Sequence, residues 1–158
     1  MKAKFIFILA AFLGILFIVS CEKDNGNGGD GGGETKISSP NSSSSHNMGR
    51  NCMTCHVSGG QGDGWFNAAG TVWDSTGNQT NPNATVKLFT KPNGEGTLRA
   101  TLYADAKGNF YTTAAIDFTG GLYPAVTGAT TTKYMSTSIT MGACNSCHGV
   151  SQAKMWVK

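Results

Sequence analysis

Charged side chains are scarce in this sequence. Lysine, arginine, aspartate and glutamate make up only 13% of its 158 residues, and there are just three histidines. No cluster of basic residues stands out, which argues against a nucleic-acid partner. Beyond residues 1–20, no window of a dozen residues shows a strong 3.6-residue hydrophobic period, which argues against a helical bundle. Glycine, serine, threonine and asparagine are abundant instead, as is typical of an extracytoplasmic β-rich domain.

Long apolar runs are also absent, with one exception at the N-terminus. Residues 5–19 are almost wholly apolar and follow two lysines, which is the pattern of a bacterial export signal over residues 1–20. The run is too short for a comfortable membrane-spanning helix. It ends in Ile18-Val19-Ser20-Cys21, which resembles a bacterial lipobox, so we expect Cys21 to be lipidated and to anchor the chain to the membrane. The alternative is an ordinary signal peptide in which Cys21 is incidental.

The segment after the signal is rich in glycine and serine. Residues 22–45 contain little that could bury apolar surface, so they are predicted to form, with Cys21, a flexible tether over residues 21–45. The folded part is then residues 46–158, which is large enough for one domain and too small for two.

Strand and turn signals alternate at short intervals between about residues 68 and 128. In one of these strands, Ala84, Val86 and Leu88 occupy alternate positions and should share one face. We therefore predict a mainly β fold, a small antiparallel β-sandwich flanked by short helical or loop segments. The expected strands lie within residues 70–74, 84–90, 97–103, 110–113 and 122–127.

Part of this stretch resembles a known family. Gly70-Thr-Val-Trp-Asp74, Asn83-Ala-Thr-Val-Lys-Leu88 and Asp105-Ala-Lys-Gly-Asn-Phe-Tyr111 are similar to the signature of carboxypeptidase-regulatory-like, transthyretin-like β-sandwiches. The resemblance rests mainly on turn residues. It implies a module that serves for binding or as a spacer and that contributes no catalytic residues.

Four of the five cysteines form two identical patterns. Cys52-Met-Thr-Cys55-His56 and Cys144-Asn-Ser-Cys147-His148 flank the predicted sheet, and each is the Cys-x-x-Cys-His pattern of covalent haem attachment. Residues i and i+3 lie on one face of a helical turn, so both sulfurs can bond to the two vinyl groups of one porphyrin. The adjacent histidine, His56 or His148, then offers an imidazole nitrogen to the iron.

Two other uses of a Cys-x-x-Cys pair remain open, namely a disulfide or a four-cysteine zinc site. Neither requires a histidine after the second cysteine. With three histidines in 158 residues, one falls at a given position by chance about once in 50, and at both positions about once in 2,500. The pattern therefore favours two covalently attached haems, each a haem c.

The two pentapeptides resemble those of c-type cytochromes, and the chain around them is more similar to bacterial exported multihaem proteins than to the compact mitochondrial-type cytochrome. This resemblance implies an electron carrier rather than an enzyme. Its partners would be redox proteins, other multihaem cytochromes among them. Together with the lipid anchor, it implies a place in the cell envelope, on the periplasmic or cell-surface side of the outer membrane.

The number of histidines in the chain limits which sixth ligands the two irons can have. Two histidines on each iron would need four, and the chain has three, so at least one iron takes another sixth ligand or none. His46 is the candidate for one iron. Met135, and after it Met141, is the candidate for the other, because a methionine thioether is an established haem ligand. An open position would instead make the protein a gas sensor or a peroxidase, for which Arg50 is the one candidate distal group.

Three aromatic residues close in sequence to the motifs, Trp65, Phe66 and Trp156, are expected to contact the haems, while most other aromatic side chains should fill the core.

The competing functional class is a non-redox binding or adhesion lipoprotein whose β-sandwich is closed by disulfides or zinc at the two cysteine pairs.

Overall fold

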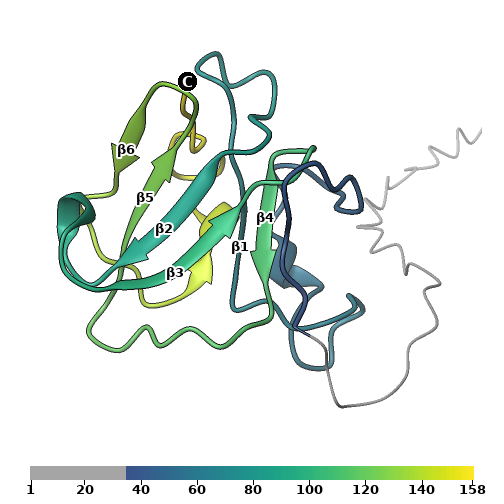
Figure 1. Cartoon of the computed structure of the whole chain (residues 1–158). Coiled ribbons are helices and arrows are strands. Elements are labelled where there is room, and N and C mark those ends of the chain that lie inside the picture. The colour runs from purple at the N-terminus through teal and green to yellow at the C-terminus, as the bar shows by residue number, and fades with distance from the viewer. Residues whose placement is uncertain (1–34) are drawn as a thin grey trace, which may run out of the picture.

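The computed structural model describes residues 35–158 (Figure 1). The predicted export signal, Cys21 and residues 22–34 of the predicted tether lie outside the described residues. The described chain forms two β-sheets and three short 3-10 turns, so the predicted mainly β fold is confirmed. The strands are β1 (Ala68–Thr71), β2 (Thr85–Phe89), β3 (Leu98–Tyr103), β4 (Asn109–Thr112), β5 (Tyr123–Thr127), β6 (Thr132–Tyr134) and β7 (Gly142–Ala143), and the turns are η1 (Cys52–Thr54), η2 (Pro92–Gly94) and η3 (Cys144–Ser146).

The two sheets pack around one apolar core, as a small β-sandwich requires. One sheet has three strands in the order β4-β1-β7, and the other has four in the order β3-β2-β5-β6. Burial alternates along β2, where Val86 and Leu88 face inward between less buried neighbours, because successive side chains of a strand point to opposite faces. Leu102 of β3 and Phe110 of β4 join them, so residues from both sheets meet in the core.

The strands that the sequence predicts at residues 70–74, 84–90, 97–103, 110–113 and 122–127 all exist, with ends shifted by a few residues. The two last strands, β6 and β7, were not predicted, because both are very short and lack apolar alternation. The pairing also departs from an all-antiparallel sandwich, since β7 runs parallel to β1. Gly142 permits this approach, because a Cβ there would overlap the backbone of Asn67 and Ala68.

The described end of the predicted tether, residues 35–45, packs against the sheet, so these residues belong with the folded part that was expected to begin at residue 46. Ile37 forms a bridge with Thr112 of β4. Ser38 is buried, and its hydroxyl donates to the Tyr103 carbonyl at 2.7 Å. A serine-rich segment can be fixed in this way without burying apolar surface, because its hydrogen bonds go to a strand edge. Composition alone does not reveal such pairing.

No helix long and apolar enough to cross a membrane is present in residues 35–158.

Candidate haem-attachment site

The first Cys-x-x-Cys-His sequence folds as a single 3-10 turn, η1. The Asn51 side chain caps this turn by accepting a hydrogen bond from the Met53 N–H at 3.2 Å, a common role for asparagine at a helix start. The N–H groups of Cys55 and His56 both donate to the Cys52 carbonyl, at 3.2 and 3.0 Å. The motif therefore adopts the single helical turn that its spacing predicts.

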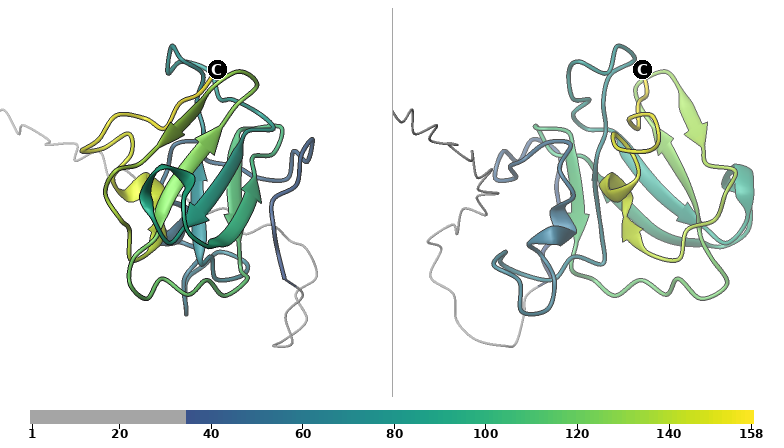
Figure 2. Two further views of the ribbon diagram at one scale, coloured as in Figure 1. Left: turned by 60° about the vertical axis from the view of Figure 1, so that its left-hand side comes forward. Right: turned by 180° about the vertical axis from the view of Figure 1, so that it is seen from behind.

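The second motif repeats this geometry in η3. The N–H groups of Cys147 and His148 donate to the Cys144 carbonyl, at 3.3 and 3.0 Å. The residues between the cysteines differ, Met-Thr in the first motif and Asn-Ser in the second, so the shared conformation does not come from shared side chains. Both turns lie beside β1 of the three-stranded sheet (Figure 2). The fold thus brings together two motifs that stand near opposite ends of the described chain.

Each motif histidine is held by a backbone carbonyl through the same ring nitrogen. Nδ1 of His56 lies 3.0 Å from the carbonyl oxygen of Asp63, and Nδ1 of His148 lies 2.7 Å from that of Ala153. A carbonyl oxygen can only accept, so Nδ1 is the donor, and in the neutral ring Nε2 then keeps its lone pair. This is the tautomer and the outer-shell hydrogen bond that a metal-ligating histidine needs. The residues present therefore fit the axial ligands that haem requires.

His46 lies at a suitable distance to share an iron with His56. Their ring centroids are 6.1 Å apart and the rings are tilted by 34°. Two imidazole rings that bind one metal, each through a nitrogen about 2 Å from it, must approach each other to within several ångströms. His46 is exposed, and its carbonyl accepts a hydrogen bond from the Asn109 side chain at 3.0 Å. The expectation that His46 is the sixth ligand of the first iron is compatible with this spacing.

Asn145, inside the second motif, ties that motif to the first. Its side chain is 3% exposed, and its amide donates to the Arg50 carbonyl and to the Thr71 hydroxyl, both at 2.9 Å. Its oxygen accepts from the Thr71 N–H at 3.1 Å. Arg50 stands two residues before Cys52, so one buried side chain fixes η3, β1 and the start of η1 relative to one another.

The same network continues from Thr71 toward His46. The Thr71 hydroxyl donates to the Asn109 side chain at 2.7 Å, and Asn109 in turn donates to the Ser45 hydroxyl at 3.0 Å. All of these side chains are buried, and a buried polar network of this kind fixes its members when every group is paired. The sequence reading missed this network. Polar residues within two strands, Thr71 and Asn109, were the available signal, whereas Asn145 was hidden at a variable position of its motif.

The motif sulfurs are in different states. Cys52, Cys144 and Cys147 are free thiols, so neither motif is closed by a disulfide within its own turn. Cys55 is disulfide-bonded, and a thioether there requires that its sulfur first be reduced. Burial, and then the nearby Cys52 sulfur, raises the pKa of Cys144 to about 12. The pKa of Cys52 is raised as well, mainly by burial. The raised pKa values favour the protonated thiols at Cys52 and Cys144.

The methionine candidates for a sixth ligand are less favourably placed than His46. Met135 follows β6, an edge strand of the four-stranded sheet whose contacts are with β5 and η2, whereas η3 packs on the three-stranded sheet. Met141 immediately precedes β7 and is 63% exposed. The structure therefore provides no sixth-ligand pair for His148 comparable to the one for His56 within the described residues.

The three aromatic residues expected at the haems have different surroundings. The Phe66 ring stacks on His56, with centroids 4.0 Å apart and planes 10° apart, and it stacks on Tyr111 behind it. Trp65 is 62% exposed. Trp156 is half-buried and lies under the Lys133 ammonium, 2.8 Å from the ring centroid. Phe66 is therefore the one of the three that directly contacts a predicted iron ligand.

A preformed zinc site is not found. Within residues 35–158, no group of three or more histidine, cysteine, aspartate or glutamate side chains is arranged to hold a metal ion. The four motif cysteines are thus not assembled as a tetrahedral set of the kind that structural zinc requires.

Comparison with known proteins adds no family assignment, because no family model matches the chain and no curated protein or solved structure matches it.

Proposed function

We propose that this chain is an exported, lipid-anchored electron-transfer protein that carries two covalently attached haems. The observation that carries this proposal is the repetition of one geometry at two Cys-x-x-Cys-His sequences, each with its histidine Nδ1 held by a backbone carbonyl. Haem would supply the one-electron exchange between ferric and ferrous iron. The protein would supply the attachment, the axial ligands and the orientation.

The first motif would hold its haem through Cys52, Cys55 and His56, and His46 would be a further ligand to the iron. Phe66 stacks on the His56 ring and limits its rotation, which keeps Nε2 directed away from the Asp63 carbonyl. The second motif would hold its haem through Cys144, Cys147 and His148, and the hydrogen bond from His148 to Ala153 would orient that ring in the same way.

The contact between the two motifs supports exchange of electrons within the molecule. Asn145 of the second motif donates a hydrogen bond to the Arg50 carbonyl, two residues before the first motif, and accepts one from the Thr71 N–H of β1, so it fixes the two turns across β1. Redox proteins of the cell envelope, including other multihaem cytochromes, would be the partners. The lipid on Cys21 would hold the protein at the outer membrane, on its periplasmic or surface side.

The direct test is to express the chain with a haem c maturation system and to measure its intact mass under denaturing conditions. We expect the mass of two covalent haem groups, and retention of haem stain on a denaturing gel. The double variant Cys52→Ala/Cys55→Ala should lose one haem and keep the other, and Cys144→Ala/Cys147→Ala should do the reverse. A folded, fully matured protein without covalent haem would overturn the proposal.

A second candidate function is a gas sensor or peroxidase that uses the second iron. It is favoured by one observation, that the described chain pairs His46 with His56 but offers no second histidine near His148 and leaves Met141 exposed. Carbon monoxide added to the reduced protein distinguishes the two functions. A spectral change in the Cys52→Ala/Cys55→Ala variant, which would keep only the second haem, supports an open iron, and an unchanged spectrum excludes it.

A further inference from the structure

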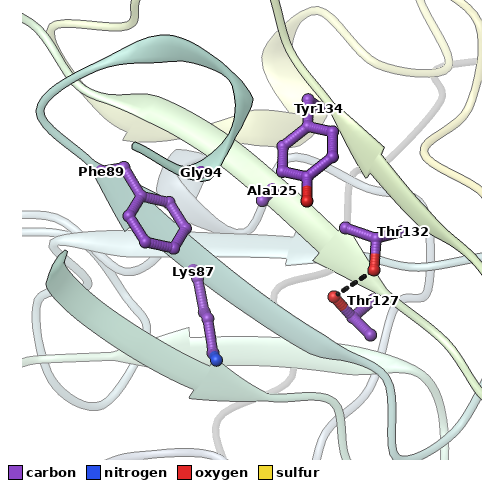
Figure 3. A pocket seen from close by; sticks show the side chains of 7 residues that line it. All are labelled: Lys87, Phe89, Gly94, Ala125, Thr127, Thr132 and Tyr134. Atoms are coloured by element: carbon purple, nitrogen blue, oxygen red, sulfur yellow. Dashed lines mark hydrogen bonds between the residues drawn. The ribbon is translucent and has the colours of Figure 1, made fainter. Parts of the chain in front are cut away.

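The outer face of the four-stranded sheet contains a hollow that the proposed electron transfer does not use (Figure 3). Its position follows from strand register. Ala125 of β5 pairs with Lys87 of β2 on one side and with Tyr134 of β6 on the other. Paired residues point to the same face of a sheet, so a small side chain lies between two long ones. The hollow exists because Ala125 forms its floor and Lys87 and Tyr134 form its walls.

The ends of the hollow differ in chemistry. At one end, Thr127 and Thr132 are cross-strand partners whose hydroxyl oxygens lie 3.0 Å apart. At the other end, Phe89 presents its ring beside the η2 loop (Figure 3). Gly94 of that loop approaches the Tyr134 ring so closely that a Cβ would lie 3.0 Å from it. The hollow has a volume of about 140 Å³ and opens to solvent, so it would hold one part of a ligand and leave the rest exposed, unlike an enclosing pocket of about 300–1,000 Å³.

The polar groups in this hollow have unused binding capacity. Among residues 35–158, the one ion pair joins Lys36 to Asp63, so the Lys87 ammonium has no carboxylate partner. Within residues 35–158, the side-chain hydrogen bond in this hollow joins Thr127 to Thr132, so the Lys87 ammonium and the Tyr134 hydroxyl bond to no other described residue. An ammonium group offers three donors and a phenol offers a donor and an acceptor. The hollow thus combines one uncompensated positive charge, several hydroxyls and two aromatic rings.

We propose that this hollow binds one acidic sugar unit of a polysaccharide. Its carboxylate would pair with Lys87, its hydroxyl groups would exchange hydrogen bonds with Thr127, Thr132 and Tyr134, and its apolar ring face would pack on an aromatic side chain. A neutral sugar would gain no ion pair with the ammonium, and a purely apolar ligand would displace water from the hydroxyls without replacing its hydrogen bonds, which costs affinity. The site is independent of the haem motifs, which lie on the other sheet.

The test is a nuclear magnetic resonance titration of the mature protein with trigalacturonate, and with galactose as the neutral comparison. Trigalacturonate should shift the amide signals of β2, β5 and β6, and galactose should not. Lys87→Gln should weaken binding about tenfold, the effect of losing about 1.4 kcal/mol, and Ala125→Leu should abolish it by filling the floor.

Lys133→Gln is the matched control. It removes the same charge from β6, but its side chain lies over Trp156, on the opposite side from Tyr134, so affinity should be unchanged. Equal binding of galactose, no binding at millimolar trigalacturonate, or equal losses in Lys87→Gln and Lys133→Gln would each overturn the proposal. Haem content is measured on the same samples, and its loss or retention does not alter this result.

Discussion

The two sheets of this protein are stabilised in different ways. The four-stranded sheet has regular antiparallel pairing, and its inner face is apolar, with Val86, Leu88 and Leu102 fully buried. The three-stranded sheet is shorter and contains buried polar side chains, among them Thr71 and Asn109, which bond to the segments that carry the motifs. Apolar burial holds the scaffold, while hydrogen bonds hold the candidate site on it. The two parts should therefore respond to substitution separately.

The largest effect is expected in the four-stranded sheet. Leu88→Ala removes a side chain that is 2% exposed, and such a change in a packed core lowers the free energy of unfolding by about 2–5 kcal/mol. Chemical denaturation of the purified protein measures it. Leu98→Ala, at the exposed start of β3, is the control and should change the value by less than about 0.5 kcal/mol. Equal effects at the two positions would show that the core lies elsewhere.

A smaller but more local effect is expected at Asn145. Asn145→Leu leaves the Arg50 carbonyl and the Thr71 N–H without their buried partner, which should lower the free energy of unfolding by about 2 kcal/mol. The decisive measurement is hydrogen exchange at the Thr71 amide, which should become faster than that of its neighbours in β1. Ser146→Ala, in the same turn but exposed, should leave the exchange unchanged. Continued protection of Thr71 would show that Asn145 does not tie the motifs together.

Sequence reasoning predicted the scaffold well because its signals are local. The alternation of Val86 and Leu88, and the turn residues between strands, define five of the strands to within a few residues. The parallel pairing of β7 with β1 depends on contact between distant segments, and the two-residue strand has no periodic signal. Burial of Ser38 was likewise not predictable, because a serine-rich segment looks the same whether it is free or paired with a strand.

The proposed ligands of the candidate site can be read from the sequence, but the groups that support them cannot. The two Cys-x-x-Cys-His sequences predict the attachment residues, and counting histidines directs attention to His46. The backbone carbonyls that orient His56 and His148 have no side-chain signature, since any residue could supply them. Their positions depend on how the following loops fold, which the spacing of the motif does not specify.

Gly62 provides a way to disturb the first motif without touching its cysteines. A Cβ on this residue would lie 2.6 Å from Nδ1 of His56, so Gly62→Ala should displace the imidazole and weaken its hydrogen bond to Asp63. We expect a loss of about 1 kcal/mol in the free energy of unfolding and a changed Nδ1 signal of His56 in a nitrogen-15 spectrum. His148 should keep its signal, and Gln61→Ala should affect neither. An unchanged His56 signal would mean that the loop around Gly62 moves and that the imidazole ring keeps its position.

The smallest effect is expected where the N-terminal segment meets the His56 loop. Lys36 and Asp63 form a surface ion pair, and Asp63 also supplies the carbonyl that binds His56. Lys36→Gln should lower the free energy of unfolding by less than about 0.5 kcal/mol, because exposed pairs contribute little. The difference should vanish in about 1 M salt, where charges are screened within a few ångströms.

Lys91→Gln is the control for this last change, since Lys91 is exposed and forms no ion pair within residues 35–158. It should have no salt-dependent effect. The backbone bonds of this segment, from Ser38 to Tyr111 and from Thr113 to Lys36, remain in both variants, and they explain why so little should be lost. A salt-sensitive loss above about 1 kcal/mol in Lys36→Gln would instead mean that charge holds the segment against β4. Electrostatic attraction would then have to be counted as a third stabilising interaction, beside apolar burial in the scaffold and hydrogen bonding at the site.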